Sequence, residues 1–179
     1  MVKVEKILIG LATVAALVGC KPLNPSTYRG LPKEYTTAYQ QIYGHCYDSL
    51  PEVAVVALDI YSEGLELDAN KQIKGTGYNL CITDIFVPDS LLETGEYRSD
   101  NTGEAFTFLP GRDYEGTPHG MYILNIEEDK LIQIQRLDSG SFVYRNDSLL
   151  FTLYYKNAYG SKATYKCSFH GPLIPWLKK

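Results

Sequence analysis

The sequence predicts an all-β fold, an antiparallel β-sandwich or barrel of about eight to nine strands preceded by one short helix. Three observations support this class. Apolar residues alternate with polar ones along most segments after Pro51. Turn residues separate these segments at short intervals, with no helical period between them. Fifteen tyrosines suit half-buried strand surfaces.

The short helix is expected at residues 32–43. Tyr35, Tyr39 and Tyr43 recur at intervals of four, a spacing that places side chains on one helix face. Pro32 suits a first helical turn, because its fixed φ and missing N–H cost nothing there. We expect this helix to cap one end of the β-domain.

Nine segments have the pattern or composition of strands. They are residues 53–61, 75–87, 95–98, 105–109, 120–126, 131–137, 141–145, 149–156 and 163–170. Hairpin turns are expected where acidic, amide and glycine residues gather, at 127–129, 146–147 and 157–160.

The first twenty residues have the layout of a secretory signal. Two lysines precede an uncharged apolar run, residues 7–18, that is too short to cross a bilayer. The next feature, Leu17-Val18-Gly19-Cys20, resembles the lipobox of bacterial lipoproteins. The resemblance implies that the residues before Cys20 are removed and that Cys20 carries a diacylglycerol thioether and acyl chains such as palmitate.

Three parts of the chain are therefore expected. These are a signal peptide at 1–19, a lipidated Cys20 with a tether at 20–31, and a single β-domain at 32–179. The chain has a net charge of −4 and no basic block. The expected partners are thus the membrane, through the lipid anchor, and not nucleic acid.

Glycine-aromatic steps open several of the expected strands, as in Gly95-Glu96-Tyr97, Gly120-Met121-Tyr122 and Gly140-Ser141-Phe142. Over residues 75–173 this order resembles a domain of uncharacterised lipoproteins and surface proteins of gut Bacteroidetes. The resemblance implies an all-β fold and an envelope location at the outer membrane, and carries no catalytic residue. The membrane face stays open, because residues 21–24 lack the acidic residues typical of a surface-export signal in such lipoproteins.

Motifs for catalysis and cofactor binding are missing from the sequence, including Gly-x-Ser-x-Gly, His-Glu-x-x-His and the phosphate-binding and dinucleotide glycine loops. No cofactor and no metal site is expected. Cys167 and His170 fall on opposite faces of one expected strand, which argues against their joint coordination of zinc. Cys46, Cys81 and Cys167 form one disulfide or none.

Two carboxylates, Asp59 and Asp84, stand inside otherwise apolar strands. If those strands are neighbours, the carboxylates can share a face. A separation of about 5 Å would suit a retaining glycosidase and a wider gap an inverting one. The alternative is that each faces solvent or accepts a hydrogen bond from a tyrosine or a backbone donor.

The candidate binding loop is residues 110–120, which is long for a hairpin connection. It offers a guanidinium, two carboxylates, an aromatic ring and an imidazole, groups that can stack on a sugar and hydrogen-bond its hydroxyls: Arg112, Asp113, Tyr114, Glu115 and His119. The alternative is a solvated connection with local ion pairs.

The tripeptide Asp-Ser-Leu occurs three times at expected element boundaries, and turn chemistry explains it. The motif is also similar to the O-glycosylation motif of Bacteroidetes envelope proteins. That similarity would make Ser49, Ser90 and Ser148 acceptor candidates.

The function expected from these features is that of a lipid-anchored envelope protein, a non-catalytic binding or accessory module for a glycan, a peptide or a partner protein. One alternative is a glycoside hydrolase that uses Asp59, Asp84 or Glu115. The other is a structural or assembly subunit, which predicts a large exposed apolar patch or a long unpaired edge strand.

Overall fold

A computed structural model of the chain describes residues 30–176, so the expected signal peptide, Cys20 and most of the tether lie outside the described residues. Strands, turns and loops make up residues 30–176, which confirms the all-β class. None of these residues forms a helix of the length and apolar character needed to cross a membrane. The strands in chain order are β1 (Glu34–Tyr35), β2 (Thr37–Gly44), β3 (Ala54–Tyr61), β4 (Leu65–Leu67), β5 (Ile73–Gly75), β6 (Gly77–Val87), β7 (Gly95–Ser99), β8 (Thr107–Phe108), β9 (Arg112–Tyr114), β10 (Thr117–His119), β11 (Met121–Glu127), β12 (Lys130–Arg136), β13 (Ser139–Arg145), β14 (Ser148–Lys156), β15 (Lys162–His170) and β16 (Ile174–Trp176).

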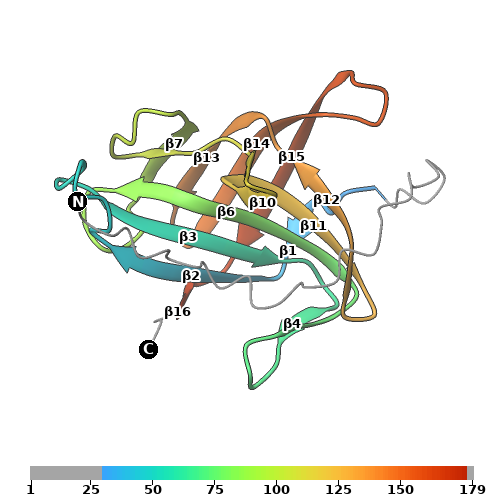
Figure 1. Cartoon of the computed structure of the whole chain (residues 1–179). Coiled ribbons are helices and arrows are strands. Elements are labelled where there is room, and N and C mark those ends of the chain that lie inside the picture. Colours follow the sequence, from blue (N-terminus) through green and yellow to red (C-terminus); the bar gives the residue numbers. More distant parts are fainter. Residues whose placement is uncertain (1–29, 177–179) are drawn as a thin grey trace.

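Twelve of these strands form one sheet that curls into an open half-barrel (Figure 1). Ten strands follow each other in the order β1-β15-β14-β13-β7-β8-β6-β3-β2-β16, and the β11–β12 hairpin extends from β6. The strand count of eight to nine was too low, and the architecture is neither a closed barrel nor two packed sheets. Three pairings are parallel, those of β1 with β15, β16 with β2, and β7 with β8.

All nine strands expected from the period-two pattern are present, as β3, β6, β7, β8, β11, β12, β13, β14 and β15. The three expected hairpin turns are present as well. Asn146 and Asp147 have φ values of 48° and 54°, the left-handed pair that a two-residue hairpin turn requires.

The helix expected at residues 32–43 is wrong, because this segment forms β1 and β2. A spacing of four residues is also a multiple of two, so Tyr39 and Tyr43 share one face of β2 as they would share one face of a helix. The opposite face of β2 lies against the inner core, since Ala38 pairs with Ile60 across the sheet. The local pattern fits a helical period and a strand period equally well. Pairing with β3 makes this segment a strand.

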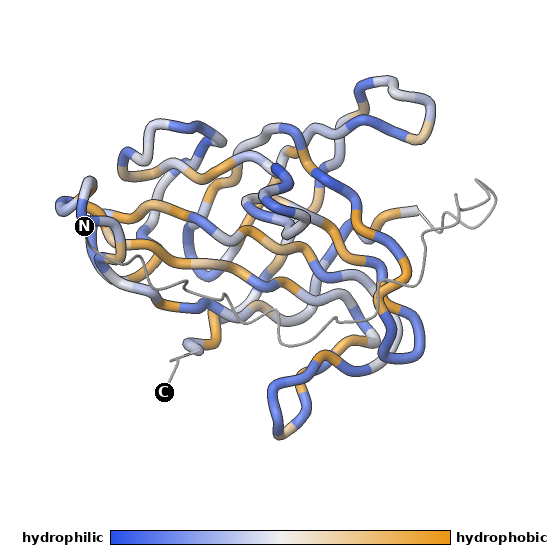
Figure 2. Tube along the Cα trace, in the orientation of Figure 1, coloured by the Kyte–Doolittle hydropathy of each residue, from blue (hydrophilic) through white to orange (hydrophobic). Residues whose placement is uncertain are grey.

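The inner core fills the concave side of the curled sheet. Its largest side chains are fully buried and include Leu58, Ile82, Tyr97, Phe108 and Phe142. The rings of Tyr97 and Phe142 stack with centroids 4.6 Å apart. Figure 2 shows the strands alternating between apolar and polar residues, as expected of sheets with distinct faces.

The outer face of the central strands β3 and β6 is covered too. Every residue of β3 is buried, although only alternate residues reach the inner core. A second apolar cluster on the outer face includes Tyr61, Leu65, Tyr122 and Leu124, and a third includes Val55 and Phe86. The polar outer-face residues that lie between these clusters make the candidate site.

Candidate functional site

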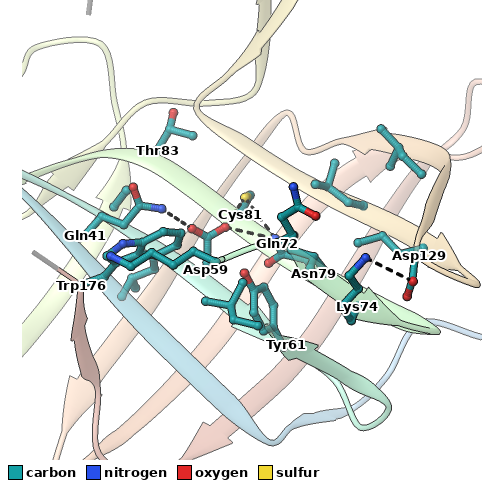
Figure 3. A pocket seen from close by; sticks show the side chains of 18 of the residues that line it. Gln41, Asp59, Tyr61, Gln72, Lys74, Asn79, Cys81, Thr83, Asp129 and Trp176 are labelled. Carbon is teal, nitrogen blue, oxygen red and sulfur yellow. Dashed lines mark hydrogen bonds and ion pairs between the residues drawn. The ribbon is translucent and has the colours of Figure 1, made fainter. Parts of the chain in front are cut away.

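A cavity of about 260 Å³ lies on the outer face of the sheet, and we call it the Asp59 cavity. Its floor comes from β2, β3, β6 and β11. The β4–β5 hairpin and β16 stand at its sides and mouth (Figure 3). This volume lies just below the range of about 300–1,000 Å³ that is usual for drug-sized ligands. The cavity therefore suits one small molecule or one unit of a polymer.

Asp59 is central to the floor and is 9% exposed. Its carboxylate accepts three hydrogen bonds from side chains of neighbouring strands. The Gln41 Nε2 donates to Oδ2 at 2.5 Å, the Asn79 Nδ2 donates to Oδ1 at 3.1 Å, and the Cys81 thiol donates to Oδ1 at 2.7 Å. Pairing across the sheet places these groups together, because Asp59 stands opposite Tyr39 on β2 and opposite Cys81 on β6.

Asn79 is 1% exposed and gives the floor a second acceptor. Its Nδ2 is used by Asp59, whereas its Oδ1 receives no hydrogen bond from residues 30–176. The neighbouring amide oxygen, Gln41 Oε1, is satisfied by the Tyr43 hydroxyl at 2.8 Å. A buried carbonyl oxygen without a donor costs about 1–3 kcal/mol, so this atom is suited to a ligand that brings a donor.

The wall formed by the β4–β5 hairpin is apolar at Leu67 and Ile73, and Leu124 and Ile126 of β11 add apolar surface to the floor. The mouth carries charge and one large aromatic ring. Trp176 packs edge-on against Tyr39 at 6.3 Å, and the Lys71 Nζ lies 5.0 Å from the centroid of the Trp176 ring.

At the mouth, the β11–β12 turn is joined to β5 by an ion pair and a hydrogen bond. Lys74 forms an ion pair with Asp129 at 3.5 Å, and the Asp129 Oδ1 accepts a hydrogen bond from the Gly75 N–H. This hydrogen bond is the main reason that the pKa of Asp129 lies below its usual value.

The neutral forms of the floor groups are stabilised by burial. Desolvation, and then the charge of Asp59, raises the pKa of the Cys81 thiol well above its usual value. Desolvation also raises the pKa of Tyr43, with further contributions from Asp59 and Asp84. Cys81 and Tyr43 therefore act as neutral hydrogen-bond donors and not as nucleophiles.

Asp59 forms no ion pair with any residue between 30 and 176. The ion pairs formed within this range join Lys74 to Asp129 and Arg136 to Asp113 and Asp138. The described chain therefore binds this buried carboxylate through neutral donors only.

Asp59 and Asp84 do lie on neighbouring strands, and both face outward from the inner core. Only Asp59 lines the cavity. Asp84 accepts hydrogen bonds from the Thr83 hydroxyl at 2.7 Å and from the Tyr47 hydroxyl at 3.2 Å. Across a register shift between β3 and β6, Thr83 and Asp84 together face Ala57, which is two residues from Asp59, so the two carboxylates are separated by about 7 Å along the strand direction.

The candidate loop at residues 110–120 forms the exposed β9–β10 hairpin and does not line the Asp59 cavity. Tyr114, 61% exposed, packs edge-on against His119 at 6.0 Å, and Glu115 sits in the turn with a φ of 49°. Arg112 and Asp113 are exposed, although the Tyr122 hydroxyl contacts both of them. The structure thus separates Glu115 from Asp59.

The remaining candidate residues are dispersed. Ser49 and Ser90 are exposed, whereas Ser148 is half-buried and its hydroxyl lies 3.0 Å from His170 Nδ1. Cys46, Cys81 and Cys167 are all free thiols. Over the described range, 30–176, no three His, Cys, Asp or Glu side chains are grouped so as to hold a metal ion.

The sequence pattern indicates Asp59 but not its hydrogen-bond partners Gln41 and Asn79, nor Trp176 at the mouth of the cavity. One signal was present. Asn79, Cys81 and Thr83 alternate with Leu80 and Ile82 in a strand that is otherwise apolar, which marks a polar strip on one face of a buried strand.

Comparison with known proteins gives no match to a family model, to a curated protein or to a solved structure. Function is therefore inferred from the residues of this chain alone.

Proposed function

We propose that the protein is a lipid-anchored envelope module that binds one small polar ligand, a unit of a glycan or of a peptide, in the Asp59 cavity. The observation that carries this proposal is the combination of a polar floor with apolar walls and an aromatic ring at the mouth. Ligand sites commonly combine apolar walls with a few convergent polar groups. No step of covalent chemistry is needed for this role.

Binding is tested by thermal shift with a panel of neutral monosaccharides, amino sugars and amino acids on the full chain in detergent. We expect at least one compound to raise the Tm of the wild type and not of the Trp176→Ala variant. Tyr114→Ala removes an exposed aromatic ring outside the cavity and is the matched control. If no compound in the panel raises the Tm, the proposed binding role is wrong.

The anchor is proposed on the lipobox resemblance at Leu17-Val18-Gly19-Cys20. It is tested by mass spectrometry of the processed N-terminus after expression in a bacterial host with a lipoprotein pathway. We expect a chain that begins at an acylated Cys20, and a Cys20→Ala variant that is not acylated. An N-terminus that retains residues 1–19, or an unmodified Cys20, would contradict the anchor and the outer-membrane location.

Glycoside hydrolysis is the second candidate, because Asp59 and Asp84 project from the same face of adjacent strands. Their separation of about 7 Å along the strand direction is closer to an inverting than to a retaining arrangement. Three protein donors on Asp59 and the position of Asp84 outside the cavity favour binding instead. Release of sugar from a glycan by the wild type and not by Asp84→Asn would favour hydrolysis.

A further inference from the structure

No cation of residues 30–176 forms an ion pair with the buried Asp59. Its three hydrogen bonds come from two amides and a thiol, all neutral donors. An ionised carboxylate that is removed from water pays a large desolvation cost unless it is paired or extensively hydrogen-bonded. The two lysines that line the cavity, Lys71 and Lys74, stand at the mouth, where Trp176 and Asp129 contact them.

A second buried acceptor lies beside this carboxylate. The same Asn79 side chain that donates to Asp59 through Nδ2 keeps an Oδ1 without a donor among residues 30–176. Figure 3 shows Asp59, Asn79 and Gln41 side by side on the floor of the cavity. A ligand group that serves both acceptors must carry more than one hydrogen, and a positive charge strengthens its bond to the carboxylate.

We propose that the Asp59 cavity selects ligands that carry a primary ammonium group. The ammonium, which has three N–H donors, binds the Asp59 carboxylate and the Asn79 Oδ1. This inference rests on the proposed binding function and names the chemistry that the site recognises. A hydroxyl group has a single hydrogen and no charge, so it satisfies one acceptor and leaves the carboxylate without a counter-charge.

The residues at the mouth restrict the charge and size of the part of the ligand that lies away from the ammonium. Lys71 and Lys74 repel a second positive charge and attract oxygen atoms, while the Trp176 ring offers an apolar face. A volume of about 260 Å³ leaves room for one compact unit. A short ligand with an ammonium at one end and hydroxyl or carboxylate oxygens at the other matches this distribution. Amino sugars and amino acids share that chemistry.

Titration calorimetry on the full chain separates charge from shape by comparing D-glucosamine with D-glucose and N-acetyl-D-glucosamine. The three sugars share a ring, and only the first has an ammonium. We expect glucosamine to bind at least about tenfold more tightly than either neutral sugar, the ratio that one charge-assisted hydrogen bond provides. Glycine and L-alanine form a second arm that distinguishes an amino-acid ligand from an amino-sugar ligand.

Variants locate the effect. Asp59→Asn is close in shape and removes the charge, so it should abolish the preference for glucosamine over the neutral sugars. Asp113→Asn, on the exposed β9, is the control and should bind like the wild type. The comparison of ligands on the wild type needs no variant and stands even if Asp59→Asn fails to fold.

The two proposals fail in different ways. If glucose binds as tightly as glucosamine, the ammonium inference is wrong and the binding function stands. If neither the amines nor the neutral sugars bind, both are wrong. If only the amino acids bind, and do so with a loss of at least about tenfold in Asp59→Asn, the ammonium inference holds and the ligand is an amino acid.

Discussion

At the scale of single residues, burial raises the pKa of several tyrosine hydroxyls. Tyr97 has no exposed surface, and desolvation raises its pKa to about 12. The hydroxyl is nevertheless satisfied, since it donates to the Glu93 carbonyl and accepts from the Glu93 N–H, each at 3.0 Å. Tyr47 and Tyr122 are shifted in the same direction and to the same value.

The stability of the protein should therefore fall as pH rises through the window from about 10 to 12. An unfolded tyrosine loses its proton near pH 10, while the folded Tyr97 keeps its proton to about pH 12. The unfolded state binds fewer protons in this window, and each such tyrosine lowers the free energy of unfolding by at most about 1.4 kcal/mol per pH unit. Urea unfolding at pH 8 and pH 11 measures this loss.

The Tyr97→Phe variant tests how much of the fall in the free energy of unfolding with pH comes from Tyr97. It should cost about 0.5–1.5 kcal/mol at pH 8, where it loses hydrogen bonds, and it should lose less additional stability at pH 11 than the wild type. An identical loss between pH 8 and pH 11 in both proteins would contradict the assignment to Tyr97.

At the scale of elements, the β4–β5 hairpin forms one wall of the cavity, and its base depends on glycine. Gly75 has a φ of 100°, and a Cβ at this position would lie 2.0 Å from the Gly64 carbonyl oxygen. At the tip, the Asp68 Oδ1 accepts hydrogen bonds from the N–H groups of Asn70 and Gln72. The hairpin thus holds Lys71 and Lys74 at the mouth.

Gly75→Ala should displace this hairpin and weaken ligand binding. We expect a loss of about 1–3 kcal/mol in the free energy of unfolding, from backbone strain and the clash together, and faster hydrogen exchange in residues 65–75. Gly160→Ala is the matched control, because Gly160 has a φ of 75° but no atom within 4 Å of the position that a Cβ would take. Equal effects of the two substitutions on exchange in the hairpin would contradict a role for the close approach to Gly64.

Strands with a sustained alternating pattern were predictable, and most of the short or ambiguous ones were not. β3 and β6 have eight and eleven residues, long enough for apolar alternation to be read. β4, β5, β9, β10 and β16 have three residues each, which is too short for a period. Pro118 and Pro175 also argue against strands, although both stand in short pairings at the margins of the fold.

The site was predictable only in part for a related reason. Asp59 is visible as a charge in an apolar strand, but its partners come from β2 and β6, and the pairing of these strands is set by tertiary contacts. The tyrosine spacing predicts a helix that includes Gln41, and such a helix would not pair Gln41 with the strand of Asp59. The polar loop at 110–120 has the composition of a binding loop, yet it forms a separate hairpin and lines no part of the cavity.

At the scale of the whole molecule, the hydrophobic core and the candidate site lie on opposite faces of the half-barrel. The inner core, with its buried aromatic rings, stabilises the fold on the concave side. The outer face of the same central strands carries Asp59 and Asn79 and is walled by the β4–β5 hairpin and β16.

Trp176 provides the most direct measurement of ligand binding, because it is the only tryptophan in the chain and stands at the cavity mouth. We expect its fluorescence to change saturably when D-glucosamine or an amino acid is added to the full chain, and this change to be lost in Asp59→Asn. A folded wild type whose Trp176 fluorescence does not change with any of these compounds would contradict ligand binding in the Asp59 cavity.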